Sequence, residues 1–210
     1  MELISPKNLD LAVQAVTAGK LVVLPTKRWY MICANARDPG ACERIFAGKR
    51  RPQSKSLAYV VPHVSAADNL FVMTRHARQL ASAFWPGDLA MILRWSDIGI
   101  GQQHQPVGVP GALVTLDPGP LGQLALESPV PIAATTVNIS NTDFAGPAIT
   151  MAEVQQFLVE SGVEVTYGLD GGICPLAHHL TIVDCMDTEA KIIRSGVVHE
   201  RAVNAAITAM

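Results

Sequence analysis

Residues 21–36 read LVVLPTKRWYMICANA, and this stretch sets the kind of fold that the chain can adopt. The short apolar run over residues 21–25 predicts a buried strand that ends at Pro25. A second apolar run predicts another strand over residues 30–36. The polar residues between them would then lie at the carboxyl end of a strand, where α/β proteins usually bind ligands. An ordinary turn between two strands is the alternative interpretation.

Helical and strand-like segments alternate on both sides of this stretch. Apolar spacing and end signals predict helices over residues 10–18, 40–48, 65–72, 74–84, 150–161 and 198–208. Thr74 is expected to be an N-cap, and Thr150 with Glu153 a capping box. Short apolar segments predict further strands over residues 57–61, 89–95, 113–116, 132–137, 163–167, 181–184 and 191–194. Interleaved elements without a repeat or a long linker predict one α/β or α+β domain over residues 1–210, built around a mixed sheet.

The composition excludes several classes of protein. The 210 residues are 49% hydrophobic and 16% charged, which is typical of a folded chain and not of a disordered one. The apolar runs are too short to span a bilayer, and the N-terminal residues do not resemble a signal peptide. The four cysteines form no CxxC pair and are expected to be reduced thiols. We therefore expect a cytoplasmic protein without a membrane contact, whose low charge is compatible with a homo-oligomer.

Basic residues are concentrated in one part of the chain. Residues 27–55 hold eight of the 16 Lys and Arg residues but two of the 18 Asp and Glu residues. A site for a polyanion requires such a concentration of positive charge. The net charge of −2 argues against a protein that is basic over its whole surface, as many nucleic-acid binders are. Chance clustering on a solvated helix and loop is the alternative.

Several familiar motifs are missing. The sequence has no Walker A motif, no dinucleotide fingerprint and no GxSxG nucleophile elbow. A zinc site could be drawn from Cys174, His178, His179 and Cys185, but zinc proteins do not normally use this spacing. We expect no metal ion held by protein side chains.

Two further polar segments fit a nucleotide site. Residues 49–55 (KRRPQSK) combine lysine ammonium groups with planar guanidinium groups, which suit triphosphate oxygens. Residues 133–140 (AATTVNIS) place small and hydroxyl side chains at the end of a predicted strand, where backbone N–H groups can approach a phosphate. A solvated basic loop and a buried strand leading into a turn are the respective alternatives.

Taken in order, these segments resemble the motifs of the YrdC/Sua5 family over about residues 8–197. Pro25–Ile32 resembles P-T-x-T-x-Y-G-L, and Lys49–Leu57 resembles K-x-R-P-x-x-K-P-L. Four more motifs follow in the family's order: W-P-G-P-x-T-x-x-L at 85–93, A-T-S-A-N-x-S-G at 134–141, G-G-x-x-S-T-V-V-D at 171–184 and R-x-G at 194–196. Each match alone is weak, whereas six in the correct order are a strong signal.

The resemblance implies a fold, a reaction and partners. The fold would be a twisted, open, mostly parallel sheet flanked by helices, with a basic concave cleft. The reaction would join L-threonine, bicarbonate and ATP into threonylcarbamoyl-AMP with release of pyrophosphate, for threonylcarbamoyladenosine in tRNA. Mg²⁺ would accompany ATP, and RNA or tRNA-modification proteins would be partners. Positioning and charge neutralisation are what such a transfer needs.

The resemblance also implies site residues. Those on the nucleotide side would be Lys49, Arg51, Lys55, Thr136, Asn138, Ser140 and Arg194. Those of the substrate pocket would be Thr26, Arg28, Tyr30, Met31 and Thr181.

The amino-acid side departs from the family's pattern. Arg28 replaces the second threonine of P-T-x-T, and Met31 replaces the glycine after the tyrosine. Thr115 stands where a basic residue is usual, and Leu180 replaces a serine. A site that selects a hydroxyl group does so through partners of this kind, so selectivity for threonine is open.

Three hypotheses follow from these matches and departures. The first is a divergent threonylcarbamoyl-AMP synthase. The second is an enzyme that uses ATP to activate a different carbamate or carboxylate, with Arg28 pairing with an extra acid group of the substrate. The third is a non-catalytic protein that binds a nucleotide or RNA, which the retention of both nucleotide-side motifs argues against.

Overall fold

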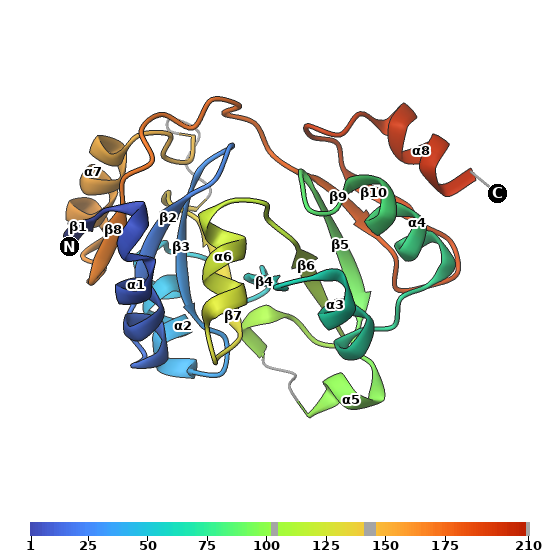
Figure 1. Cartoon of the computed structure of the whole chain (residues 1–210), viewed down its shortest axis with the longest axis horizontal. Coiled ribbons are helices and arrows are strands. Elements are labelled where there is room, and N and C mark those ends of the chain that lie inside the picture. The colour runs from blue at the N-terminus through green and yellow to red at the C-terminus, as the bar shows by residue number, and fades with distance from the viewer. Residues whose placement is uncertain (102–104, 141–145, 209–210) are drawn as a thin grey trace.

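The computed structural model describes residues 1–101, 105–140 and 146–208, and its strands form one large sheet (Figure 1). The strands are β1 (Glu2–Ile4), β2 (Val22–Pro25), β3 (Tyr30–Asn35), β4 (Ala58–Val60), β5 (Leu89–Arg94), β6 (Gly111–Thr115), β7 (Ile132–Thr136), β8 (Tyr167–Leu169), β9 (Thr181–Asp184) and β10 (Lys191–Arg194). The α-helices are α1 (Leu9–Thr17), α2 (Pro39–Gly48), α3 (Val64–Leu70), α4 (Arg75–Phe84), α5 (Asp97–Ile100), α6 (Pro120–Glu127), α7 (Met151–Ser161) and α8 (Glu200–Thr208). Short 3₁₀ turns are η1 (Pro6–Asn8) and η2 (Gln105–Val107).

The strand order is β1-β8-β2-β3-β7-β4-β6-β5-β9-β10. Four of the nine neighbouring pairs are parallel: β1 with β8, β8 with β2, β4 with β6 and β5 with β9. The α/β class with helices flanking a large sheet is confirmed. The expectation of a mostly parallel sheet is wrong, because short connections such as the one between β2 and β3 allow only antiparallel pairing.

The central strands are buried on both faces, which explains their continuous apolar runs. Tyr30 and Ile32 of β3 belong to one core cluster, whereas Met31 and Cys33 belong to the other. Helices α1 and α6 cover the second cluster, and α2, α3, α4, α7 and α8 contribute to the first. In Figure 1, α1 and α6 lie in front of β2 and β3, and the segment from β8 to β9 runs along the top edge of the sheet.

Most predicted elements are present, with one clear error. The strands over 181–184 and 191–194 are confirmed to the residue, as are the Thr74 N-cap and the capping box of α7. The strand over 163–167 is wrong, since β8 begins at Tyr167. Val163 and Val165 are instead buried in the first core cluster from an irregular segment. Helix α6 and strand β1 were not predicted.

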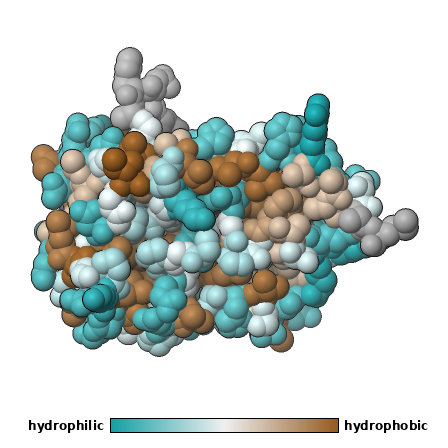
Figure 2. Space-filling view, turned by 45° about the horizontal axis from the view of Figure 1, so that its top comes forward, coloured by the Kyte–Doolittle hydropathy of each residue, from teal (hydrophilic) through white to brown (hydrophobic). Residues whose placement is uncertain are grey.

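Among the described residues, no helix is both long enough and apolar enough to cross a membrane. On the face drawn in Figure 2, hydrophobic residues occur in several groups among hydrophilic ones. Exposed large apolar side chains include Ile98, Val159 and Ile173, which lie far apart in the sequence. A homo-oligomer stays a prediction.

Replacing Thr150 with alanine should destabilise the chain by about 1 kcal/mol. The Thr150 hydroxyl accepts a hydrogen bond from the Glu153 amide, and Glu153 Oε2 accepts from the Thr150 and Ile149 amides at 3.0 and 2.7 Å. Urea unfolding measures the change. Thr17→Ala is the control, because the exposed Thr17 hydroxyl only donates to a carbonyl of its own helix, that of Val13, and we expect little change.

Candidate functional site

A buried lysine organises the loop that follows β7. Lys49 caps the C-terminus of α2 and is 1% exposed. Its Nζ donates to the Asn138 carbonyl at 2.6 Å and to Asn138 Oδ1 at 3.0 Å, and it also donates to the Thr136 carbonyl. The Thr136 hydroxyl donates to Asn138 Oδ1 at 2.8 Å, and the Ser140 amide donates to the Lys49 carbonyl at 2.8 Å. Four residues predicted for the nucleotide side therefore lie together, and we call them the Lys49 cluster: Lys49, Thr136, Asn138 and Ser140.

The environment of Lys49 changes its protonation. Burial, and to a smaller extent the positive charge of Arg51, lowers the pKa of Lys49 to about 7. The Nζ atom also lies 5.9 Å from the centre of the Phe157 ring. The three accepting oxygens use all three N–H groups of the ammonium, so Lys49 acts mainly by fixing the loop and by its charge.

Arg51 shapes the next loop through its own guanidinium group. Its Nε donates to the Lys55 carbonyl at 2.9 Å, and its Nη2 donates to the Ser56 carbonyl at 2.6 Å. Burial lowers the pKa of Arg51. Lys55 itself is exposed. The loop over residues 50–56 is thus folded around one guanidinium group, beside the Lys49 cluster.

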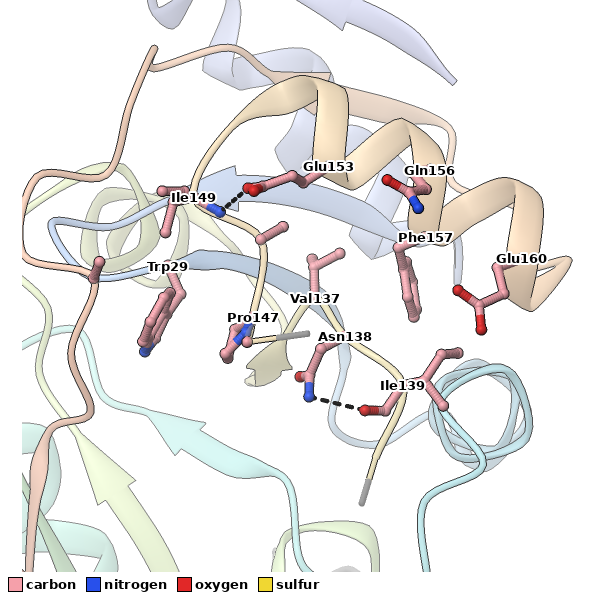
Figure 3. A pocket seen from close by; sticks show the side chains of 13 residues that line it. Trp29, Val137, Asn138, Ile139, Pro147, Ile149, Glu153, Gln156, Phe157 and Glu160 are labelled. Carbon is pink, nitrogen blue, oxygen red and sulfur yellow. Dashed lines mark hydrogen bonds between the residues drawn. The ribbon is translucent and has the colours of Figure 1, made fainter. Parts of the chain in front are cut away.

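A cavity of about 640 Å³ lies beside Asn138. Its lining is mostly apolar, with the Trp29 ring at one end, the Phe157 ring at the other, and Val137 and Pro147 between them (Figure 3). Asn138 Nδ2 donates to the Ile139 carbonyl at 3.0 Å, so the asparagine side chain is held at the cavity wall. A flat apolar group with a charged neighbour would suit this space.

Thr26 closes the turn between β2 and β3. Its hydroxyl donates to the Trp29 carbonyl at 2.9 Å and accepts from the amides of Arg28 and Trp29 at 3.1 Å. The Val137 amide donates to the Tyr30 carbonyl at 2.9 Å, so the turn lies next to the loop that carries Asn138. Thr26 thus shapes the turn, while it also lines a second cavity of about 640 Å³.

Tyr30 ties this turn to the segment that follows β8. The Tyr30 hydroxyl donates to the Gly172 carbonyl at 2.9 Å and accepts from the Gly171 amide at 3.1 Å. Burial raises the pKa of Tyr30 to about 12. The phenol is therefore neutral at physiological pH and serves as a fixed link in the pocket wall.

Arg28 has a partner within the chain. Its guanidinium Nη1 forms an ion pair with Oδ1 of Asp88, and both residues line the second cavity together with Asp117. The hypothesis that Arg28 pairs with an extra acid group of the substrate stays a prediction, and the acid group that Arg28 pairs with in this structure is Asp88. Burial raises the pKa of Asp117, whose Oδ1 accepts from the Gly119 amide at 2.8 Å.

Two predicted pocket residues have other roles. Met31 points to the opposite face of β3 from Tyr30 and packs in the core cluster covered by α1 and α6, because side chains alternate along a strand. Thr181 is fully buried, and its hydroxyl donates to the Val198 carbonyl at 2.6 Å. Neither lines the two cavities described above.

Arg194 is the last residue of β10, which is separated from β7 by β4, β6, β5 and β9 in the strand order. Its Nε and Nη2 donate to the Leu180 carbonyl at 3.3 and 3.1 Å. No hydrogen bond or ion pair between described residues joins it to Lys49, so the structure brings together only part of the predicted nucleotide set. Burial, and then the charge of Arg28, lowers the pKa of Arg194.

Three residues near the turn were not predicted as site residues. Trp29 lines the first cavity, 5.6 Å from the His179 ring, and Asp88 and Asp117 line the second. The sequence held a sign that Asp88 is unusual, because Asp88 replaces the second proline of the family's W-P-G-P motif. Asn141, the last residue of the A-T-S-A-N-x-S-G match, lies outside the described residues. Within the described ranges no group of three or more His, Cys, Asp and Glu residues could hold a metal ion.

Comparison with known proteins gives consistent matches. A model of the Sua5, YciO and YrdC family, described as "Telomere recombination", matches residues 14–196. A threonylcarbamoyl-AMP synthase of Pyrococcus abyssi is 30% identical over 204 residues, which are 93% of this chain and 56% of that protein. A putative threonylcarbamoyl-AMP synthase of Mycobacterium tuberculosis (strain CDC 1551 / Oshkosh) is 29% identical over 199 residues, 91% of this chain and 85% of that protein. The chain thus spans little more than half of the Pyrococcus relative.

Solved structures share the fold. The P. abyssi Sua5 crystal structure, complexed with L-threonine, matches with a TM-score of 0.83 at 24% identity, over 99% of this chain and 60% of that one. E. coli YciO matches with a TM-score of 0.79 at 19% identity, over 96% of this chain and 97% of that one.

Proposed function

Because the chain belongs to the Sua5, YciO and YrdC family, we propose that it is an adenylyl-transfer enzyme that makes a carbamoyl-adenylate from an amino acid, bicarbonate and ATP. The amine of the amino acid and bicarbonate give a carbamate and water. A carbamate oxygen then attacks the α-phosphorus of ATP, and the bond to the β,γ-phosphates breaks to release pyrophosphate. L-Threonine is the first candidate amino acid, since relatives are named threonylcarbamoyl-AMP synthases.

The hydrogen-bonded cluster of Lys49, Thr136 and Asn138 carries this proposal. It joins two segments 87 residues apart around one ammonium group, and Asn138 of the cluster lines a cavity. Simple packing would not require a buried charge at this place, because apolar side chains fill such a position at lower cost. A preorganised charge beside an apolar cavity suits a nucleotide, whose base is flat and whose phosphates are anionic.

The remaining nucleotide residues would neutralise phosphate charge. We assign this role to the guanidinium groups of Arg51 and Arg194 and to the ammonium group of Lys55. Guanidinium groups bind phosphate oxygens through paired N–H donors. Mg²⁺ would enter as part of the MgATP substrate, and the Thr136, Asn138 and Ser140 loop would position the phosphates. Positioning and charge balance are the main requirements of phosphoryl and adenylyl transfer.

The later fate of the product is part of the proposal. A carbamoyl-adenylate is an activated acyl group, and threonylcarbamoyladenosine in tRNA is the proposed destination. The chain would pass the intermediate to RNA or to a tRNA-modification protein, in the cytoplasm.

Pyrophosphate release tests the reaction directly. The chain is incubated with ATP, Mg²⁺ and bicarbonate, and each amino acid is supplied in turn. We expect release that needs both bicarbonate and one amino acid, with threonine as the first candidate. If the protein binds ATP in calorimetry but releases no pyrophosphate with any amino acid, the proposal is contradicted and a binding role is favoured.

One observation favours a second candidate, the same chemistry on another amino acid or carboxylate. Arg28 replaces a threonine of the family's motif, and its ion pair with Asp88 stands at the edge of the second cavity. Release with an amino acid other than threonine would support this candidate.

A further inference from the structure

The turn between β2 and β3 contributes to both cavities. Residues 25–28 line the second cavity, of about 640 Å³, whereas Trp29 lines the first, which is the cavity beside Asn138. No described residue lines both cavities, so they are separate spaces on either side of the step from Arg28 to Trp29. A nucleotide bound in the first cavity and another substrate bound in the second would meet at this turn.

The wall of the second cavity is rich in proline. Six of the described residues that line it are prolines: Pro6, Pro25, Pro86, Pro118, Pro120 and Pro175. Proline has no backbone N–H group and a fixed φ, so this part of the wall is stiff and offers no amide donors. An aliphatic chain can pack against such a wall, whereas a phosphate would lack hydrogen-bond donors there.

Two carboxyl groups and one buried guanidinium group also line the second cavity. Arg28 is 4% exposed and forms its ion pair with Asp88. Asp117 is 6% exposed and forms no ion pair with another described residue. Lys27 also lines the cavity, but it is exposed, so water screens its charge. The carboxyl group of Asp117 is therefore left without a buried counter-ion.

The backbone compensates only partly for the burial of Asp117. Its Oδ1 accepts from the Gly119 amide at 2.8 Å, directly before α6. Burial raises the pKa of Asp117, and the charge of Asp88 acts in the same direction. The amides of Gly119 and Gly122 and the charge of Arg28 lower this pKa, but less than burial raises it. A cation in the cavity would stabilise the ionised carboxylate.

We propose that the second cavity binds an ammonium group at the end of an aliphatic chain, with the Asp117 carboxylate as its counter-ion. The ammonium group supplies the compact positive charge and the N–H donors that the carboxylate lacks, and its methylene groups pack against the prolines. The inference rests on the proposed function, in which the ligand is the amino acid, and it makes that substrate a diamino acid such as L-lysine or L-ornithine. The α-amine would form the carbamate, while the cavity holds the side-chain ammonium group.

The test compares ligands that differ only in the ammonium group. Calorimetry with α,β-methylene-ATP present gives Kd for L-lysine, L-ornithine, L-threonine and L-norleucine, whose side chain has the four carbons of lysine without the ammonium group. Pyrophosphate release is measured with the same amino acids, ATP, Mg²⁺ and bicarbonate. We expect L-lysine or L-ornithine to bind roughly 10- to 100-fold more tightly than L-norleucine, as a hydrogen bond between charged groups would give.

Asp117→Asn removes the charge and keeps the shape of the side chain. We expect it to raise Kd for the diamino acid roughly 10- to 100-fold and to leave Kd for L-norleucine within twofold. Asp187→Asn is the matched control, because Asp187 is 78% exposed, pairs with Arg94 and lines neither cavity, so no Kd should change. Thermal unfolding of each variant checks the fold.

The site is overturned if both diamino acids bind within twofold of L-norleucine, or if a folded Asp117→Asn chain keeps their affinity. If Asp117→Asn does not fold, the comparison of ligands in the unchanged chain decides. Pyrophosphate release with L-threonine but with neither diamino acid would overturn this inference and leave the proposed function standing. Tight binding of a diamino acid that depends on Asp117, without pyrophosphate release from any amino acid, would contradict the proposed function and leave the ammonium site standing.

Discussion

Lys49→Met should lower kcat/KM for ATP by about 100-fold, which is the size of effect that small misplacements of a reacting group produce. The substitution removes the charge and leaves the carbonyls of Thr136 and Asn138 without their donor. The loop after β7 would then lose the arrangement that places Asn138 at the cavity wall. Pyrophosphate release measures the rate, and calorimetry measures the affinity for ATP.

The control for this variant is Lys20→Met. Lys20 is exposed and precedes β2, whereas the turn with Arg28 follows that strand, so we expect no change in either measurement. Thermal unfolding separates a local effect from general loss of structure. A well-folded Lys49→Met chain with unchanged ATP affinity would mean that the cluster only supports the fold.

The Lys49 cluster shows how much of the candidate site could be predicted from the sequence. Two polar segments, each at the end of a predicted element, were expected to meet because their order and spacing resemble a known family. The structure brings Lys49, Thr136, Asn138 and Ser140 together as expected. The exposed fraction of Lys49, 1%, could not be predicted from the sequence. A run of basic residues has the same sequence pattern whether its side chains are solvated or buried.

Other features depend on contacts that no local pattern encodes. The ion pair of Arg28 with Asp88 joins residues 60 positions apart, and only the path of the chain brings them together. Met31 was assigned to the pocket by its motif position, although strand alternation places it on the face opposite Tyr30. The face of the sheet on which a strand side chain lies can be assigned only when the arrangement of the strands is known. The motif alone does not give this arrangement.

The missed elements have similar causes. Helix α6 begins at Pro120, directly after its N-cap Gly119, and the two glycines and one proline within residues 119–122 favour a turn in a sequence analysis. Proline at the first helical position is nevertheless compatible with a helix. Strand β8 is only three residues long, and it pairs in parallel with β1 and β2. The sequence of residues 163–167 contains no signal for this pairing. That residues 1–210 form one domain stays a prediction.

ATP should bind more weakly as the pH rises above 7, by up to about tenfold per pH unit. The Lys49 pKa of about 7 means that the amine loses its charge over this range in the free protein. An anionic ligand favours the ammonium form, so binding takes up a proton and Kd rises with pH until the pKa of the complex is passed. Calorimetry between about pH 7.5 and 9 avoids the last phosphate ionisation, which lies near pH 6.

Lys49→Met separates this lysine from other titrating groups, and Kd of that variant should be independent of pH in the same range. Burial raises the pKa of Tyr30 to about 12 and that of Cys174 to about 11, so neither group changes charge there. Stability should move in the opposite direction from affinity. The lysine pKa is near 10.4 in the unfolded chain, so the unfolded state holds the extra proton between about pH 7 and 10 and the free energy of unfolding rises with pH. A Kd that stays constant to pH 9 in the original chain would mean that Lys49 keeps its proton, held by its three accepting oxygens.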